Sequence, residues 1–219
     1  MDKITSNYLG QSMRKLNIPN DLVLFLSGTS CVGKTSVAHL LLKIVPEFRN
    51  ISEMDIVRTV ARSILGDMSI ISAAINSDIF SKYLPLFKST KDGDYRVFKQ
   101  QAEFFIDPIR AIVRRQQSRK IPTIIEGINI IPSLYFIEDR PIDGFNHNIL
   151  FVNLYLSDEI EHCQRRAHRC KEREYLDSEE DILNKVKKIR KNKNEELHQE
   201  CCSLGERVNN VFSIDTVDK

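Results

Sequence analysis

Short apolar runs alternate along the chain with longer segments in which apolar residues recur every three or four positions. Residues 21–27 are apolar almost throughout, as is typical of a strand buried on both faces of a parallel sheet. Helical spacing follows over 35–45, and Pro46 ends that segment. Further strands are expected at 48–51, 121–125, 148–157 and 208–214. This alternation predicts an α/β fold with a five-stranded parallel sheet and right-handed crossovers.

The helical segments between these strands carry start and stop signals. Gly66 is expected to end a helix that begins at Asp55. Pro108 is expected to kink or split one long helix over 95–119. Further helices are expected at 70–79, from Asp158, and from Ser178, where Asp177 and Ser178 precede Glu180 and Asp181 in a capping-box pattern.

Composition is that of an ordinary soluble domain. The 219 residues suffice for one α/β domain, with 42% hydrophobic and 28% charged residues. A formal net charge of +2 provides no overall field that favours nucleic acid or a membrane surface. Five cysteines, an odd number, do not indicate a disulfide scaffold. No apolar run is long enough for a bilayer, and residues 1–7 lack the apolar stretch of a signal peptide, so we expect a cytoplasmic protein.

The stretch Gly-Thr-Ser-Cys-Val-Gly-Lys-Thr at 28–35 matches the nucleotide-binding pattern G-x-x-x-x-G-K-[ST]. It follows the predicted buried strand and precedes an amphipathic helix, which is the context this motif requires. Its glycines allow backbone N–H groups to turn toward a phosphate, and the helix N-terminus adds a positive dipole. Lys34 would reach the β- and γ-phosphates, and the Thr35 hydroxyl would ligate Mg²⁺. We expect ATP and Mg²⁺ as ligands, with ATP held by Gly28, Ser30, Cys31, Val32, Gly33, Lys34, Thr35 and Ser36.

The loop indicates a nucleotide site without naming the reaction. Asn-Lys-Asn-Glu at 192–195 resembles the guanine-reading pattern of GTPases, but Glu195 replaces the required Asp. This segment lies in a Lys-rich helical stretch, which we interpret as a solvated face. An AAA-type ATPase would need more chain and an acidic pair after the third strand, where Glu126 is followed by Gly127. A small P-loop kinase remains.

Acidic and basic residues at two strand ends fit a kinase. Asp55 follows the second strand, at the sheet edge where substrates bind in such folds, and could accept the proton of an acceptor hydroxyl. Arg58 and Arg62, about one turn apart, could face an anionic substrate. The alternative is a helix cap with two surface arginines. Glu126 closes the third strand and could hold the Mg²⁺ water shell or the substrate hydroxyl, or could only orient Thr35.

Four arginines follow the fourth strand within residues 165–173. Such a cluster indicates a lid that closes over the transferred phosphoryl group and excludes water. Arg165 and Arg169 share one helix face, and Arg166 and Arg173 share another. The alternative is a solvated helix with ion pairs to neighbouring glutamates. Under the lid interpretation, the catalytic residues are Lys34, Asp55, Arg165, Arg166 and Arg169.

Several of these segments together resemble the archaeal 2-phosphoglycerate kinases and their kinase-domain relatives. The likeness extends in pieces over residues 22–213 and includes the loop at 28–35, Asp-Ile-Val-Arg at 55–58, Ile-Ile-Glu-Gly-Ile-Asn-Ile-Ile-Pro at 124–132, and Ser157, Asp158 and Glu159 followed by His162, Arg165, Arg166 and Arg169. The resemblance implies that ATP with Mg²⁺ donates phosphate to a small hydroxylated molecule. It also implies that Asp55 is the base or substrate anchor and that residues 165–169 form a lid. Asn129 stands where the family shows His, near the expected acceptor pocket, and Cys31 stands where it usually shows Gly.

We therefore expect one P-loop kinase domain over 1–219, a three-layer α/β/α fold of the nucleoside-monophosphate-kinase type. Residues 1–20 would be a leader, shorter than the regulatory module of the family it resembles. Residues 67–119 would be a helical acceptor-binding insertion, and 158–176 the Arg-rich lid. The acceptor would be a metabolite similar to 2-phosphoglycerate or a natural product, in contact with Asp55, Arg58, Arg62, Glu126 and Asn129.

Other functions stay open on the sequence alone. They are an antibiotic-modifying or self-resistance phosphotransferase, a nucleoside or polynucleotide kinase, and a nucleotide-binding regulatory module without transfer activity. Basic residues over 185–193 have acidic neighbours and no interleaved aromatic residues, so we expect no nucleic-acid partner. We expect no membrane partner either, and the choice between monomer and homodimer is open.

Overall fold

The computed structural model of the chain describes residues 17–72, 95–137, 140–141, 148–172, 174 and 177–217. Most of the helix expected at 70–79, the middle of the 67–119 insertion, and Arg173 lie outside these residues. None of the helices in the described ranges is long and apolar enough to cross a membrane. The elements, in chain order, are β1 (Val23–Gly28), α2 (Lys34–Ile44), β2 (Asn50–Glu53), α3 (Met54–Ser72), α5 (Tyr95–Glu103), α6 (Ile106–Ser118), β3 (Thr123–Glu126), the 3₁₀ turn η1 (Pro132–Leu134), β4 (Phe136–Ile137), β5 (Arg140–Pro141), β6 (Ile149–Tyr155), α7 (Glu159–Glu172), α8 (Glu179–Ile189), the π-helical turn η2 (Arg190–Asn194), α9 (Glu195–Gly205) and β7 (Val211–Asp215).

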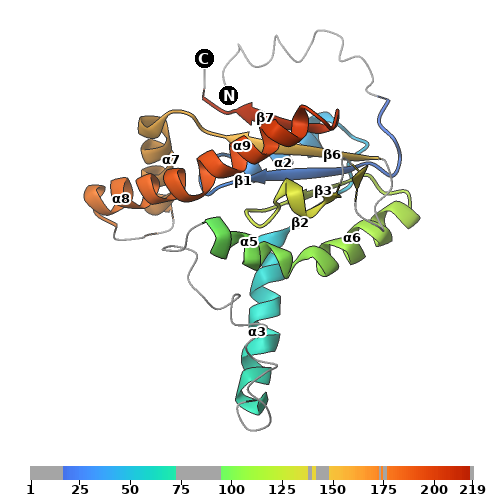
Figure 1. Cartoon of the computed structure of the whole chain (residues 1–219), viewed down its shortest axis with the longest axis horizontal. Helices are drawn as coiled ribbons and strands as arrows, with labels where there is room; N and C mark the ends of the chain where they lie inside the picture. Colours follow the sequence, from blue (N-terminus) through green and yellow to red (C-terminus); the bar gives the residue numbers. More distant parts are fainter. Residues whose placement is uncertain are drawn as a thin grey trace.

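Five strands form one parallel sheet in the order β2-β3-β1-β6-β7 (Figure 1). β1 occupies the centre and pairs with β3 on one side and β6 on the other. The chain fills one half of the sheet before it crosses β1 to the other half, so the loop after β1 lies at a topological switch point. Ligands bind at this place in open α/β sheets. The predicted five-stranded parallel sheet is confirmed.

Side chains of β1 alternate between two apolar clusters, one on each face of the sheet. Val23 and Phe25 join the cluster to which α5, α6 and α9 contribute. Leu24 and Leu26 join the cluster to which α2 contributes. Each fully buried Leu or Phe stabilises the fold by about 1.5–3 kcal/mol relative to an exposed one. These layers form a three-layer α/β/α P-loop fold, as expected.

The helix end expected at Gly66 is wrong, whereas the expected break in the helix over 95–119 is present. Gly66 does not end its helix, because α3 continues to Ser72 and projects away from the sheet (Figure 1). One interior glycine costs a helix only about 1 kcal/mol, which does not suffice to end it. The helical stretch over 95–119 is split as expected, and the break lies at Phe104 and Phe105, between α5 and α6. Pro108 lies in the first turn of α6, where no N–H is needed, and its ring excludes a helical carbonyl four residues earlier.

Helices α8 and α9 are connected through η2 without a break in the helical path. We expected residues 192–195 to form a solvated face, but η2 buries two of them. Lys193 is only 9% exposed and Asn194 only 2%. The burial of Lys193 follows from its spacing. Lys193 comes seven positions after Val186 and four before Leu197, so the three residues share one helix face. A π-turn such as η2 widens the helix locally and is often found at functional sites.

Candidate active site

The loop from Gly28 to Thr35 connects β1 to α2 and has an unusual backbone. Gly28 has φ of 138°, and a Cβ there would lie 2.5 Å from the Leu154 carbonyl oxygen. Gly33 has φ of 93°, and Cys31 has φ of 68° although it carries a side chain. Left-handed residues of this kind turn neighbouring N–H groups toward one point and form an anion-binding concavity. The loop therefore has the geometry that a phosphate group requires.

Lys34 begins α2 and folds back over this loop. Its Nζ donates to the Thr29 carbonyl oxygen at 2.7 Å, and the side chain is buried. Burial lowers the pKa of Lys34 to about 8, although the nearby Glu126 and Asp55 carboxylates act to raise it. A phosphate at the loop would favour the charged form of this lysine.

Thr35 and Glu126 meet across the sheet edge. The Thr35 hydroxyl donates to Glu126 Oε1 at 2.9 Å. Burial raises the pKa of Glu126, while Lys34 and the hydrogen bond from Thr35 act to lower it. A hydroxyl and a carboxylate are oxygen donors of the kind that Mg²⁺ prefers, together with water and phosphate oxygens. These two side chains therefore fit a Mg²⁺ ion beside the phosphate loop.

A cavity of about 680 Å³ opens between the loop and α3, and we call it the α3 cavity. It brings together eight of the site residues predicted from the sequence: Ser30, Lys34, Thr35, Asp55, Arg58, Glu126, Arg166 and Arg169. Asp55 lies in the first turn of α3, where its Oδ1 accepts a hydrogen bond from Arg58 Nη2 at 2.9 Å. Its side chain is 55% exposed, so a ligand in the cavity can reach it.

A second cavity, of about 580 Å³, opens between the loop and α7, and we call it the α7 cavity. Cys31, Gly33 and Ser36 line it, together with residues of α7 that include Arg165. The α3 and α7 cavities share three lining residues, which are Lys34, Thr35 and Arg169. These three side chains therefore stand where the two cavities meet.

The arginines of α7 have different surroundings. Arg169 Nη1 donates to Ser30 Oγ in the loop at 3.2 Å. Arg165 is held by Glu161 at 2.6 Å and by the Thr216 carbonyl oxygen at 2.6 Å. Arg166 lies 3.6 Å from an Asp177 carboxylate oxygen. Arg169 thus contacts the loop. The contacts given for Arg165 and Arg166 are with protein groups outside the loop.

Two residues that support the loop were not assigned a role from the sequence. His162 on α7 is fully buried, and its Nε2 lies 2.9 Å from the Ser30 carbonyl oxygen. Burial lowers the pKa of His162, so the neutral ring is favoured, with its N–H toward Ser30. Asn194 on η2 accepts from Thr29 Oγ1 at 3.2 Å and donates to the Leu156 carbonyl oxygen at 3.1 Å. The apolar spacing around 194 was the available signal, because it places η2 against the protein interior.

Two predicted substrate contacts, Asn129 and Arg62, are not among the described residues that line these cavities. Asn129 is 1% exposed and is not among the residues that line the α3 or α7 cavity. Its Nδ2 has no hydrogen-bond partner among the described residues. Arg62 lies within α3, and its side chain is outside the described part of the structure. A substrate contact for either residue stays a prediction.

Comparison with known proteins adds one relative in sequence. The chain is 25% identical over 158 residues to a 2-phosphoglycerate kinase of Methanothermobacter thermautotrophicus, a match covering 69% of this chain and 48% of that protein. The chain thus spans about half the length of the curated relative it matches. No family model matches. Like the sheet order and the loop, this weak match agrees with a P-loop kinase-like fold.

Solved structures offer weaker likenesses. A shikimate kinase from Acinetobacter baumannii in complex with shikimate has a TM-score of 0.41 at 16% identity, covering 93% of this chain and 86% of that one. An uncharacterized protein from Eubacterium ventriosum has a TM-score of 0.40 at 15% identity, covering 89% of this chain and 88% of that one. At these TM-scores neither likeness says anything about the reaction.

Proposed function

We propose that the protein is an ATP-dependent kinase that transfers the γ-phosphoryl group to a hydroxyl group of a small molecule. The meeting of two cavities at Lys34, Thr35 and Arg169 is the observation that carries the proposal. A nucleotide in the α7 cavity would extend its γ-phosphate to this junction. An acceptor in the α3 cavity would reach it from the other side, so that donor and acceptor are held in line for transfer.

Asp55 is the proposed general base. As the acceptor oxygen forms its bond to the γ-phosphorus, the bond from that phosphorus to the β–γ bridging oxygen breaks, and ADP leaves. The hydroxyl proton passes to the Asp55 carboxylate, which lines the α3 cavity. Arg58 donates to the same carboxylate and keeps it oriented. Charge and atoms balance without any further reactant.

Fixed positive charge stabilises the transferring group. Lys34 and Arg169 are the cations at the junction, and such charges stabilise a phosphoryl group as it moves between oxygens. Thr35 and Glu126 would hold Mg²⁺, Glu126 through water. Mg²⁺, when bound, neutralises charge on the β- and γ-phosphates.

The weak relative in sequence supports the same class of reaction, since it is named a 2-phosphoglycerate kinase. Its match extends to about half of that protein, so its acceptor is not carried over to this chain. The acceptor proposed for this protein is a small hydroxylated molecule, a metabolite or a natural product.

Asp55→Asn tests the proposal. With labelled ATP and a panel of hydroxylated acids, phosphoglycerates, nucleosides and aminoglycosides, the wild-type protein should phosphorylate at least one acceptor. Asp55→Asn should lower that rate by about a hundredfold or more while ATP affinity stays the same. Asp107→Asn is the matched control, because Asp107 forms the same i,i+3 pair with Arg110 in the first turn of another helix, α6.

Two results would overturn the proposal. If Asp55→Asn transfers phosphate at the wild-type rate, Asp55 is not the base. If ATP binds but the wild-type protein phosphorylates none of the acceptors, a nucleotide-binding module without transfer activity is the better description.

A further inference from the structure

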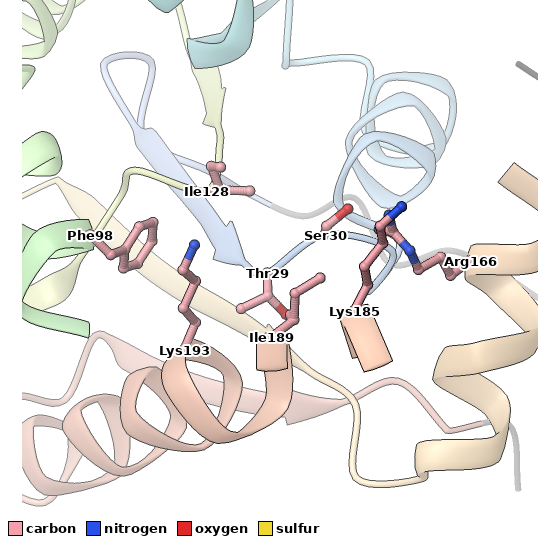
Figure 2. A pocket seen from close by; sticks show the side chains of 8 residues that line it. All are labelled: Thr29, Ser30, Phe98, Ile128, Arg166, Lys185, Ile189 and Lys193. Atoms are coloured by element: carbon pink, nitrogen blue, oxygen red, sulfur yellow. The ribbon is translucent and has the colours of Figure 1, made fainter. Parts of the chain in front are cut away.

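A third cavity, of about 180 Å³, adjoins the α3 cavity and shares Ser30, Ile128 and Arg166 with it. We call it the Lys193 cavity. Figure 2 shows Lys193 and Phe98 next to each other on one side of it, with Lys185 and Arg166 on the other side beside Ser30. The Lys193 cavity is therefore a side chamber of the proposed acceptor site, and any role for it in binding the acceptor rests on that proposed function.

One part of the chamber wall is apolar. Phe98 from α5, Ile128 from the loop after β3, and Ile189 from α8 all line it. Phe98 is 1% exposed and belongs to the apolar core, so its ring is a fixed surface. An apolar wall favours a hydrocarbon group, because a polar group placed against it would lose hydrogen bonds to water.

The rest of the wall is basic. Arg166, Lys185 and Lys193 line the chamber, and no acidic residue is among its described lining residues. Arg166 and Lys185 share Asp177, which lies 3.6 Å from the first and 2.6 Å from the second and partly neutralises them. Among the described residues, the chamber wall therefore carries more positive than negative charge.

Lys193 differs from the other two cations. It is 9% exposed, and its Nζ lies 5.0 Å from the centroid of the Phe98 ring. Burial lowers the pKa of Lys193 to about 8, and the like charge of Arg58 acts in the same direction. Arg58 from α3 is a charged neighbour among the described residues, and Arg166 from α7 and Lys185 from α8 line the opposite side of the chamber. A bound anion would favour the charged form of Lys193.

We infer that the acceptor carries a hydrocarbon body and a single carboxylate, and that Lys193 binds this carboxylate beside the ring of Phe98. The hydroxyl to be phosphorylated would then lie in the α3 cavity near Asp55. A phosphoglycerate fits this chamber poorly, because it carries a phosphate as well as a carboxylate and has no hydrocarbon surface to place against Phe98, Ile128 and Ile189. The specificity of this protein is therefore for a hydroxylated, largely hydrocarbon monocarboxylic acid.

Benzoate, benzyl alcohol and inorganic phosphate test the inference as probes. Benzoate joins an apolar body to one carboxylate, benzyl alcohol lacks the charge, and phosphate lacks the hydrocarbon. Titration calorimetry should show benzoate binding at least about tenfold more tightly than either of the others. Lys193→Met should weaken benzoate binding by about tenfold or more. Lys191→Met is the matched control, since Lys191 lies in the same turn and is exposed.

A second measurement guards against a variant that merely loses its fold. Above pH 8, much of the Lys193 population is neutral in the free protein, so benzoate binding should take up protons. Calorimetry in two buffers of different ionisation enthalpy measures this uptake in the wild-type protein. Equal binding of benzoate and benzyl alcohol, unchanged benzoate affinity in Lys193→Met, or benzoate binding without proton uptake would each overturn the inference.

These outcomes are separable from failure of the proposed function. Binding of an ATP analogue in the same variants monitors the nucleotide site, which Lys193 does not line. Normal nucleotide binding and phosphoryl transfer without benzoate binding would contradict only the carboxylate chamber. Benzoate binding in a protein that transfers no phosphate would contradict only the kinase.

Discussion

The hydroxyl of Thr35 donates to Glu126 Oε1 across 2.9 Å and so joins the first turn of α2 to the end of β3. Thr35 and Glu126 are separated by 91 positions in the chain. This pair stands at the edge of the phosphate loop, where a Mg²⁺ ion bound to the nucleotide would need its oxygen ligands. The contact therefore predicts how the reaction depends on metal.

Glu126→Gln should lower the transfer rate by about 10–100-fold and raise the Mg²⁺ concentration needed for half-maximal activity, because the water shell of the ion loses a charged partner. Thr35→Val should have a comparable effect through loss of the ligand oxygen, whereas Thr35→Ser should keep most of the activity. Rates measured as a function of Mg²⁺ concentration test this. An unchanged Mg²⁺ requirement in Glu126→Gln would exclude Glu126 from the metal site.

Nucleotide affinity should fall as the pH rises through about 8, the range to which burial lowers the pKa of Lys34. The sign follows from the charge: below this pH the lysine is protonated and attracts phosphate, and above it the free protein must first gain a proton. The expected loss is up to about tenfold per pH unit. Dissociation constants of a non-hydrolysable ATP analogue between neutral and alkaline pH measure it, and a flat profile would contradict the role given to Lys34.

Arg165 and Arg169 should separate into a structural and a catalytic role. Arg169→Ala should lower kcat by about a hundredfold or more, because it removes a cation at the junction of the cavities. Arg165→Ala should mainly lower the free energy of unfolding, by about 1 kcal/mol, because the Thr216 carbonyl oxygen loses its guanidinium partner. Transfer kinetics and urea unfolding of both variants check this. Equal losses of kcat would show that both arginines act on the transferred group.

His162 should make stability depend on pH in the acid range. Burial lowers its pKa in the folded state, so the folded protein favours the neutral ring. The stabilisation that neutral His162 gives the folded protein is therefore fully present above the pKa of the unfolded chain, about 6.5. It is lost as the pH falls from there toward the lower pKa of His162 in the folded protein. His162→Gln keeps an N–H donor for the Ser30 carbonyl oxygen and should remove much of this acid sensitivity. The urea concentration at the unfolding midpoint, measured at decreasing pH, compares the wild-type protein with His162→Gln. An equal decrease of this midpoint in both proteins would contradict the prediction.

The phosphate loop and the central strand could be predicted because each depends on neighbours in sequence. The run 21–27 has the continuous apolar pattern of a strand buried on both faces, and the spacing of Gly28, Gly33, Lys34 and Thr35 is set by one short turn. Asp55 could be placed at the sheet edge for the same reason. The helix end expected at Gly66 was wrong, because a glycine only weakens a helix. The split expected from Pro108 is present, and it lies just before this proline because a proline is tolerated in the first turn of the next helix.

Burial of single polar residues was the least predictable feature. The charge of a lysine-rich stretch alone predicts a solvated helix face. Lys193 nevertheless belongs to the buried face of α8, η2 and α9. Its apolar neighbours on that face are Val186 and Leu197. This pattern indicates which helix face turns inward. It does not indicate that the phosphate loop and Phe98, which belong to other elements, lie against that face.

The sequence by itself determined the parallel sheet, the phosphate loop and the acidic residues at the ends of two strands, since these follow from periodic burial and short-range backbone geometry. Only the tertiary structure decided that Asn194 supports Thr29, 165 positions away, and that Lys193 lies over the ring of Phe98. The physical reason is that contacts between distant segments depend on how whole helices pack on the sheet. In this protein that packing formed the basic, partly apolar chamber beside the phosphate loop.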